Sequence, residues 1–308
     1  MKFTPESKTI VQGIVEPLGS THAGLMKAYG TNIVAGVSPG YGGKEVSEIP
    51  VFDLVEQAVD AVGAIDTTII FVDPFLALDA ALEAIAAGVR QIVIVTEGMP
   101  PLDMVRLVRK AEATDTLVVG PNCPGIIVPE KVLLGTHPVD FYTPGSVGLI
   151  SRSGTLTYEV ALTLTEAKLG QSIGVGIGGD TIIGSSFAQW LQILEEDENT
   201  EAIVLVGEIG GGDEETAAQY VAEAIDKPVV AYIAGRHAPI GQRFGHAGAI
   251  VAAHLSGAHR GGDRPLLKSD IGTAERKFEA FKQAKIPVAD RISDLPDLVK
   301  KALKKKKK

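Results

Sequence analysis

The sequence predicts an α/β protein with two doubly wound domains, and three observations support this prediction. The composition is 45% hydrophobic but only 5% aromatic, with 35 glycines, which is typical of short Val/Ile strands joined by tight turns. Near-continuously apolar runs alternate with helical segments, as in parallel sheets covered by helices on both faces. A length of 308 residues exceeds one comfortable hydrophobic core and fits two domains.

The first half of the chain contains five apolar runs that we expect to form parallel strands. Between the third and fourth runs lies a segment rich in Ala, Leu and Glu, residues 76–88, which predicts an amphipathic helix closed by Gly88. We expect residues 1–125 to form a Rossmann-like domain. The predicted strands are 9–11, 32–37, 68–72, 91–95 and 116–119.

The same pattern restarts after residues 129–144, which we interpret as an irregular connection. We expect residues 126–308 to form a second doubly wound domain of the flavodoxin-like type. Its lysine run, residues 304–308, predicts a frayed, disordered tail because like charges repel. The predicted strands are 146–150, 173–177, 202–206 and 228–233, and the predicted helices include 185–196 and 214–225.

Charge and cysteine content exclude several classes of protein. A formal net charge of −9 argues against a nucleic-acid surface, which needs clustered Lys and Arg. Cys123 is the only cysteine, so an intrachain disulfide is excluded and a reducing compartment is expected. Residues 1–6 lack an apolar signal core, and no run approaches the roughly 20 apolar residues of a membrane span. We therefore expect a cytoplasmic protein with no membrane or nucleic-acid partner.

Glycine-framed segments follow the predicted strands. Ligands of doubly wound sheets bind beyond the carboxyl ends of the strands, so these segments form the predicted functional surface. They are residues 120–125, 151–159, 207–211 and 245–249.

Two of these segments are candidates for binding an anion. Ser153, Gly154 and Thr155 begin a predicted helix, where bare amides and the positive end of the helix dipole attract phosphate without a basic side chain. An ordinary Ser N-cap is the alternative interpretation. The second candidate is residues 120–125, with a Pro/Gly turn around a buried, inert Cys123 as its alternative.

His246 is the predicted nucleophile, since it lies between small residues directly beyond the last predicted strand. Its neutral ring nitrogen can attack a phosphoryl group and later release it. Glu208 follows strand 202–206 at the same predicted edge, and a carboxylate that accepts the Nδ1 proton would orient Nε2 for attack. The alternatives are a surface histidine and a solvated loop carboxylate.

In their order along the chain, these four segments resemble the alpha subunit of succinyl-CoA synthetase, the succinate–CoA ligase (ADP-forming) of the tricarboxylic acid cycle. The resemblance covers nearly the whole chain. It implies that His246 is phosphorylated during turnover, that Glu208 supports it, and that the helix start at Ser153, Gly154 and Thr155 holds the phosphoryl group. It further implies that Tyr158 contacts the substrate. Near the thioester it places Asn122, Cys123 and Pro124. The coenzyme A segment that it implies is Val95, Thr96 and Glu97.

Two segments depart from the family pattern for coenzyme A. The family has a Thr-Gly-Ser-Gln turn after the first strand. The residues in its place, where the resemblance implies a contact with coenzyme A, are Val15, Glu16, Pro17 and Leu18. The carboxylate of Glu16 would repel a pyrophosphate. The family's coenzyme-contacting lysine, in a Pro-Gly-Lys-Gly-Gly loop, is Tyr41 in this chain, which the resemblance implies as a coenzyme A contact, and Lys44 follows closely as a substitute for the charge.

The resemblance also implies a reaction and a partner. Phosphate would attack succinyl-CoA to give succinyl phosphate, which would phosphorylate His246 before the group passes to a nucleotide. The sequence has no Walker A pattern, and the family holds ATP or ADP with Mg²⁺ on an ATP-grasp beta subunit. We expect coenzyme A as substrate, no metal on this chain, and a heterodimer or heterotetramer with a beta subunit. Residues 254–271 exceed the family's usual length, which predicts a surface insertion.

Other functions remain open at this point. A sister ligase would use the same phosphohistidine on acetate, malate or citrate. A nicotinamide-dependent dehydrogenase lacks its Gly-x-Gly-x-x-Gly fingerprint, since five residues, including Val15 to Leu18, separate Gly13 from the next glycine, Gly19. A serine hydrolase using Ser153 lacks the Gly-x-Ser-x-Gly elbow. A non-enzymatic regulator that binds coenzyme A is disfavoured by the second domain and His246.

Overall fold

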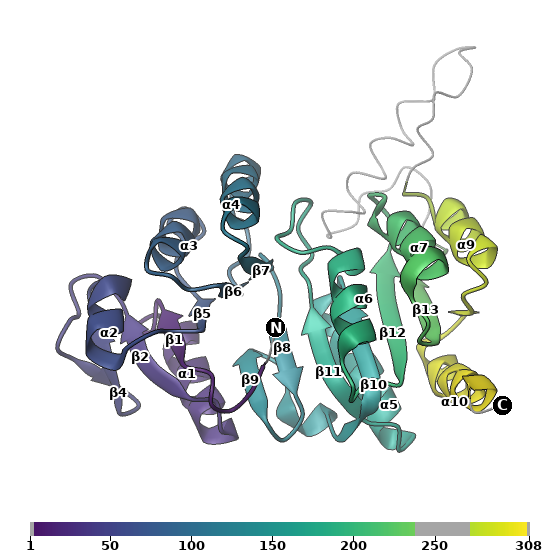
Figure 1. The fold of residues 1–308 in the computed structure, drawn as a ribbon, viewed down its shortest axis with the longest axis horizontal. Coiled ribbons are helices and arrows are strands. Elements are labelled where there is room, and N and C mark those ends of the chain that lie inside the picture. Colours follow the sequence, from purple (N-terminus) through teal and green to yellow (C-terminus); the bar gives the residue numbers. More distant parts are fainter. Residues whose placement is uncertain (1–2, 238–271, 307–308) are drawn as a thin grey trace, which may run out of the picture. The chain divides into compact units, whose positions relative to one another are not determined.

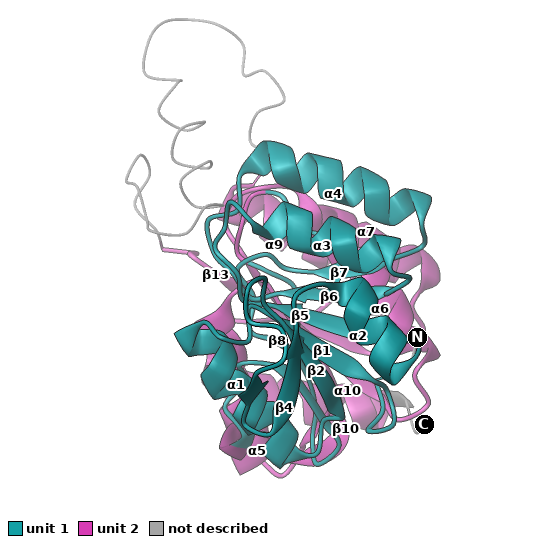
Figure 2. Cartoon of the chain, turned by 90° about the vertical axis from the view of Figure 1, so that its left-hand side faces the viewer, with its two compact units in different colours: residues 1–139, 175–178, 182–185 teal, residues 140–174, 179–181, 186–308 magenta. Residues whose placement is uncertain are grey.

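The computed structural model describes residues 3–237 and 272–306. The chain divides into two compact units, coloured separately in Figure 2. Each is built around a largely parallel sheet with helices on both faces, so the predicted α/β class is confirmed. Unit 1 consists of Met1–Val139, Val175–Gly178 and Ile182–Ser185, and unit 2 consists of Asp140–Gly174, Gly179–Thr181 and Ser186–Lys308.

The sheet of unit 1 has the order β3-β4-β2-β1-β5-β6-β7. Its neighbouring strands are parallel except for the antiparallel pair β3 and β4. Because the chain proceeds outward in both directions from β1, the carboxyl ends of β1 and β5 form the topological switch point where such sheets bind ligands. The strands are β1 (Thr9–Gln12), β2 (Ile33–Val37), β3 (Glu45–Val46), β4 (Ile49–Phe52), β5 (Thr67–Ile70), β6 (Gln91–Ile94) and β7 (Leu117–Val119).

Helices α2, α3 and α4 cover one face of this sheet and α1 the other (Figure 1). In α3 the apolar positions recur at helical spacing, so Ala77, Ala81, Ala84 and Ile85 are buried and their small side chains let the helix approach the strands closely. Gly88 follows with a positive φ of 93°, as expected beyond a helix end. The helices are α1 (Pro17–Tyr29), α2 (Val55–Val62), α3 (Ala77–Ala86) and α4 (Pro101–Ala113).

An antiparallel hairpin, β8 (Gly125–Val128) and β9 (Val132–Gly135), also belongs to unit 1. Beyond the end of α1, Thr31 Oγ1 donates to the Leu133 carbonyl at 2.7 Å and accepts from the Leu133 amide at 3.0 Å. The interpretation of residues 129–144 as irregular was therefore wrong, because this connection contains β9 and the short 3-10 helix η1 (Val139–Phe141). The division of ligand-binding roles between residues 1–125 and 126–308 stays a prediction.

The strands of unit 2 have the order β14-β13-β12-β10-β11. The pairs β10–β12, β12–β13 and β13–β14 are parallel. Every residue of the central strand β12 is buried, which explains its unbroken apolar run. The strands are β10 (Pro144–Ser151), β11 (Gln171–Gly176), β12 (Ala202–Glu208), β13 (Val229–Ala234) and β14 (Val288–Ala289).

Helices α6, α7 and α9 line one face of this sheet, and α5 and α10 the other (Figure 1). A capping box between Ser186 and Gln189 begins α6, and the fully buried Trp190 anchors it. Because α10 continues to Lys306, the prediction of a disordered tail from residue 304 was wrong for Lys304 to Lys306. The elements are α5 (Gly154–Glu166), α6 (Phe187–Glu196), α7 (Asp213–Ala224), α9 (Ala274–Gln283), η2 (Ile292–Asp294) and α10 (Leu295–Lys306).

Among residues 3–237 and 272–306, no helix combines the length and the apolar character needed to cross a lipid bilayer.

Candidate active site

Two of the predicted segments meet at the carboxyl edge of the unit 2 sheet. β10 ends at Ser151, opposite Val206 of β12, and β12 ends at Glu208, opposite Ala234 of β13. The loops that follow β10 and β12 therefore lie next to each other, as the sequence predicted. His246 falls outside the described residues, as do the remainder of segment 245–249 and the predicted insertion 254–271.

Helix α5 begins at this edge with Ser153 as its N-cap. The Ser153 hydroxyl accepts from the Leu156 amide at 3.4 Å, so the predicted helix start and its N-cap are both present. Gly154 and Thr155 occupy the first two helical positions, where amides have no intrahelical acceptor. These amides and the helix dipole can bind an anion. Tyr158 lies one turn further along α5 and is half-buried.

Arg152 follows β10 directly and was not among the predicted site residues. Its side chain is only 8% exposed. It donates to Asp213 Oδ2 at 2.7 Å and to the Asp180 carbonyl at 2.6 Å, and its Nε lies 4.0 Å from Glu208 Oε1. A charged residue at the end of an apolar strand was the available sequence signal, because such a charge is buried only with partners.

Glu208 differs from the alternative of a solvated loop carboxylate. It is the last residue of β12 and is only 8% exposed, so that interpretation was wrong. Its backbone amide donates to Glu214 Oε1 at 2.9 Å, and its carboxylate faces Arg152. A buried carboxylate whose backbone is held and whose side chain faces a guanidinium is suited to orienting another group.

Glu214, Glu215 and Lys277 form an ionic cluster behind Glu208, in which Glu214 and Lys277 are buried and Glu215 is partly exposed. We call this set the buried ionic cluster. Lys277 Nζ donates to Glu214 Oε2 at 2.5 Å and to Glu215 Oε2 at 2.9 Å, with the Lys277 side chain fully buried. Burial raises the pKa of the Glu214 carboxyl above its usual 4.5, and the positive charge of Lys277 opposes that rise.

In unit 1, the loops after β6 and β7 lie together. The Asn122 amide donates to the Thr96 carbonyl at 2.8 Å, and Thr96 Oγ1 donates to the Val72 carbonyl at 2.7 Å. Cys123 is buried, and its thiol donates to the Ile94 carbonyl at 3.2 Å. The structure thus brings together the predicted coenzyme A and thioester segments, which are Val95, Thr96 and Glu97 with Asn122, Cys123 and Pro124.

The turn between β1 and α1 lacks a basic side chain. Glu16 is the N-cap of α1 without a side-chain cap bond, Pro17 supplies no amide, and Leu18 is exposed. The Val15 amide contacts Ser38 Oγ at 3.5 Å. This turn offers a pyrophosphate fewer donors than an ordinary helix start.

The loop after β2 carries a basic side chain, Lys44. Lys44 Nζ lies 4.5 Å from the centroid of the Tyr41 ring, a cation–π contact. The amides of Gly40 and Gly42 already donate to Asp53 Oδ1, at 2.7 and 2.9 Å. Lys44, close behind Tyr41, is therefore the cation available to an anionic ligand in this loop.

Exposed large apolar side chains gather near the starts of the unit 1 helices, beyond the carboxyl ends of the strands. We call this set the apolar rim. An apolar surface at a ligand-binding edge suits the uncharged parts of a ligand. The rim consists of Leu18, Tyr41, Leu54, Phe75, Leu76 and Leu102.

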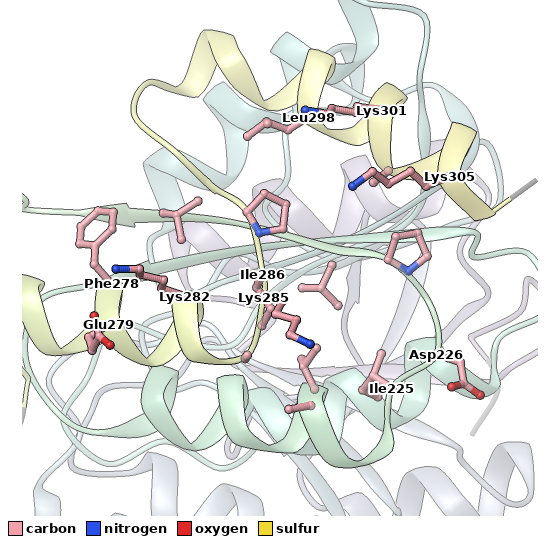
Figure 3. A pocket seen from close by; sticks show the side chains of 18 of the residues that line it. Ile225, Asp226, Phe278, Glu279, Lys282, Lys285, Ile286, Leu298, Lys301 and Lys305 are labelled. Atoms are coloured by element: carbon pink, nitrogen blue, oxygen red, sulfur yellow. The ribbon is translucent and has the colours of Figure 1, made fainter. Parts of the chain in front are cut away.

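A groove of about 1030 Å³ lies elsewhere in unit 2 (Figure 3). It is lined by α7, α9 and α10 together with Pro228, Val229 and Val288, at the amino ends of β13 and β14. Because strands of a parallel sheet share one direction, this groove is at the edge opposite Ser151 and Glu208. None of the predicted site residues lines it.

Within the described ranges, no group of three or more His, Cys, Asp or Glu side chains is arranged to hold a metal ion.

Two protein families match this chain, one in its first part and one in its second part. The CoA binding domain family matches residues 4–98, and the CoA-ligase family matches residues 150–261. The alpha 2 subunit of the succinate–CoA ligase (ADP-forming) of Archaeoglobus fulgidus is 46% identical over 297 residues, covering 96% of this chain and 97% of that protein. The corresponding alpha subunit of Aquifex aeolicus is 44% identical, covering 97% and 93%. The malate–CoA ligase alpha subunit of Methylorubrum extorquens is 50% identical, covering 82% and 87%.

Solved structures share the fold at lower identity. The ATP citrate lyase of Methanothrix soehngenii, solved with citrate and coenzyme A, superposes with a TM-score of 0.81 at 24% identity, covering 99% of this chain. This chain spans only 51% of that protein's length. The dinucleotide-forming acetyl-coenzyme A synthetase 1 of Ca. Korarchaeum cryptofilum gives 0.72 at 22% identity, covering 95% and 60%. The extent and identity of the sequence matches show that the chain belongs to the family of succinate–CoA ligase alpha subunits.

Proposed function

We propose that this chain is the alpha subunit of a succinate–CoA ligase of the tricarboxylic acid cycle, with His246 as its phosphoryl carrier. The observation that carries the proposal is the buried Glu208 carboxylate, fixed beside the anion-binding start of α5 in a chain of this family. A reacting histidine needs both features, since one orients its ring and the other holds the group it receives.

The proposed reaction has three steps. A phosphate oxygen attacks the thioester carbonyl of succinyl-CoA, the carbon–sulfur bond breaks, and coenzyme A leaves as the thiolate. Nε2 of His246 then attacks the phosphorus of succinyl phosphate, and succinate leaves as the carboxylate. Glu208 accepts the Nδ1 proton in a hydrogen bond and stabilises the positive charge on the ring. Finally a terminal oxygen of ADP takes the phosphoryl group from His246, which gives ATP and the free imidazole.

The proposed place for coenzyme A is the carboxyl edge of the unit 1 sheet. The CoA binding domain match ends at residue 98, just beyond Val95, Thr96 and Glu97. The apolar rim suits the adenine and pantetheine parts, and Lys44 offers a charge to a phosphate. Because Glu16 and Pro17 weaken the start of α1 as an anion site, the proposal assigns little phosphate binding to that turn.

A beta subunit completes the proposed enzyme. It would hold ATP or ADP together with Mg²⁺, which neutralises phosphate charge during transfer. The relatives' names as alpha subunits of ADP-forming ligases support such a partner. A heterodimer or heterotetramer in the cytoplasm, where the lone thiol of Cys123 stays reduced, belongs to the same proposal.

Phosphorylation of the assembled enzyme tests the proposal. The chain is co-purified with its beta subunit and incubated with Mg²⁺ and ATP labelled on the γ-phosphate. We expect an acid-labile label on this chain that is discharged by succinate with coenzyme A. His246→Asn should abolish the label, whereas the matched control His237→Asn, at an exposed histidine, should retain it. A label that survives in His246→Asn would place the nucleophile elsewhere.

A malate–CoA ligase is the second candidate, favoured by 50% identity over 259 residues to the Methylorubrum extorquens protein. Both candidates use the same phosphohistidine, so the labelling experiment does not separate them. The ratio of kcat/KM for succinate and malate in the assembled enzyme does. A ratio that favours malate would change the substrate assignment and leave the mechanism intact.

A further inference from the structure

The buried ionic cluster of Lys277, Glu214 and Glu215 uses every donor that a lysine has. Lys277 Nζ donates to Glu214 Oε2 at 2.5 Å, to Glu215 Oε2 at 2.9 Å and to the Gly211 carbonyl at 3.1 Å. An ammonium has three donors, and its side chain here is fully buried. The cluster therefore fixes Lys277, from α9, to the first turn of α7 and to the loop before it.

The second oxygen of Glu214 connects this cluster to Glu208. Glu214 Oε1 accepts from the Glu208 amide at 2.9 Å, while Oε2 is held by Lys277. Gly207 makes room for this arrangement. A Cβ on Gly207 would lie 2.5 Å from Glu214 Cγ and 2.8 Å from Oε1, closer than real contacts allow. The end of β12 is thus built to receive the Glu214 carboxylate against its backbone.

The first turn of α7 also influences the side chain of Glu208, through Arg152. Asp213 binds Arg152 at 2.7 Å, and Arg152 Nε lies 4.0 Å from Glu208 Oε1. Neighbouring acidic residues of one helical turn therefore act on Glu208 from two sides. Glu214 holds its backbone amide, and Asp213 holds the guanidinium that faces its carboxylate.

We propose that Lys277 is a positioning residue, which holds Glu214 against the Glu208 amide and so fixes the direction in which the Glu208 carboxylate meets the reacting histidine. The inference rests on the proposed function, because it assumes that Glu208 orients a phosphorylated histidine. Stability alone accounts poorly for the cluster, since a buried ion pair is often no more stabilising than apolar side chains of similar volume. A displacement of about 1 Å in a catalytic group, by contrast, can cost about 100-fold in rate.

Single-turnover phosphorylation of the assembled enzyme provides the test. In Lys277→Met, which keeps much of the side-chain volume, we expect the rate to fall about 10- to 100-fold with the KM for ATP unchanged. The matched control is Lys227→Met. Lys227 Nζ also donates to two carbonyls in unit 2, of Leu194 and Asp197 at 2.7 and 2.6 Å, but Lys227 precedes β13 at the amino edge of the sheet, whereas Glu208 lies at the carboxyl edge. It should keep the wild-type rate.

A double-substitution cycle separates positioning from a structural role. In a Glu208→Gln background there is no carboxylate to direct, so adding Lys277→Met should change the rate less than about two-fold. If the two losses multiply instead, Lys277 acts independently of Glu208 and the inference is wrong.

A second pair of variants keeps the test decisive should Lys277→Met fail to fold. Glu214→Gln retains an oxygen that can accept from the Glu208 amide, whereas Glu214→Ala has none. We expect the glutamine variant to react at least about ten-fold faster than the alanine variant, because only glutamine can keep the hydrogen bond from the Glu208 amide. Equal rates would overturn the inference. An unlabelled wild-type enzyme would instead overturn the proposed function, so the two failures are distinguishable.

Discussion

His137 is expected to make unit 1 lose stability in mild acid. It follows the hairpin strand β9 and is buried, with Nε2 at 3.0 Å from the Gly125 carbonyl. Since a carbonyl only accepts, Nε2 is the donor. Burial lowers the pKa of His137 from 6.5 to about 4, and the hydrogen bond to Gly125 opposes that change. The imidazole therefore stays neutral in the folded chain over a range in which it is protonated in the unfolded chain.

The size of the effect follows from proton linkage. Between pH 6.5 and about 4 the unfolded state binds more protons, so the free energy of unfolding falls as the pH falls. The contribution of His137 to the free energy of unfolding is fully present above the pKa of the unfolded state. It is lost as the pH falls to the pKa of the folded state. At about 1.4 kcal/mol per pKa unit, the loss reaches about 3 kcal/mol near pH 4.

His137→Gln isolates this contribution, because its amide can still donate to Gly125 but does not titrate. Urea unfolding of both proteins is followed by circular dichroism at several pH values, with Trp190 fluorescence as a separate reading of unit 2. We expect the wild type to lose about 3 kcal/mol more than the variant between about pH 7 and pH 4. Parallel pH profiles, or an NMR titration of the His137 ring near its ordinary pKa, would refute the reasoning.

Three further substitutions test the packing around the candidate site by urea unfolding. Glu208→Ala should cost about 1–3 kcal/mol, because Arg152 is left buried beside a lost carboxylate; an unchanged midpoint would contradict that contact. Ser153→Ala should cost about 1 kcal/mol through the lost N-cap, and a neutral result would mean that the cap bond contributes nothing. Trp190→Ala should cost about 3–5 kcal/mol through a cavity under α6, measured by circular dichroism since the fluorophore is removed.

Strand periodicity allowed the sheet edges to be predicted from the sequence. Apolar runs followed by a glycine located β6, β12 and β13 to within a few residues, and parallel strands necessarily present their carboxyl ends together. The sequence therefore predicts that the loops after β10 and β12 are neighbours, and the strand register confirms it. The same logic brought Thr96 and Asn122 together in unit 1.

Side-chain burial at this edge could not be predicted in the same way. Lys277 lies in a strongly charged helical stretch that reads as solvated, yet it is fully buried because Glu214 and Glu215 come to it from α7, about sixty positions earlier in the chain. Glu208 looked like a loop carboxylate because apolar periodicity stops before it, although β12 continues to it. Burial of a charge depends on partners that are distant in the sequence, and the periodicity of apolar residues does not identify them.

Tertiary pairing also explains the missed hairpin. β9 is a run of four residues between glycine and proline-rich stretches, too short for periodicity to identify. Its bonds to Thr31, about one hundred positions earlier, give it a partner that local sequence does not reveal. The helical state of Lys304 to Lys306 has a similar cause, because α10 packs along β12 and β13 and its ordered turns extend into the lysine run.

The buried Arg152 raises the question of which group binds the phosphoryl anion. Arginine would be a natural ligand, but its guanidinium already donates to Asp213 and to the Asp180 carbonyl and faces Glu208. With that charge neutralised by carboxylates, the amides of Gly154 and Thr155 at the start of α5 are the donors left for the anion. We therefore expect anion affinity to depend on backbone amides more than on a basic side chain.

Gly154→Pro tests this directly, because proline is tolerated at the first position of a helix and removes only one amide hydrogen. The preceding Ser153 has φ −105° and ψ 123°, which a following proline accepts. We expect the KM for phosphate, measured in the assembled enzyme with succinyl-CoA, to rise about 10-fold or more from the lost bond to a charged group. Gly154→Ala keeps the amide and should keep the KM. If proline and alanine behave alike, the Gly154 amide does not bind the anion, and the expectation is wrong.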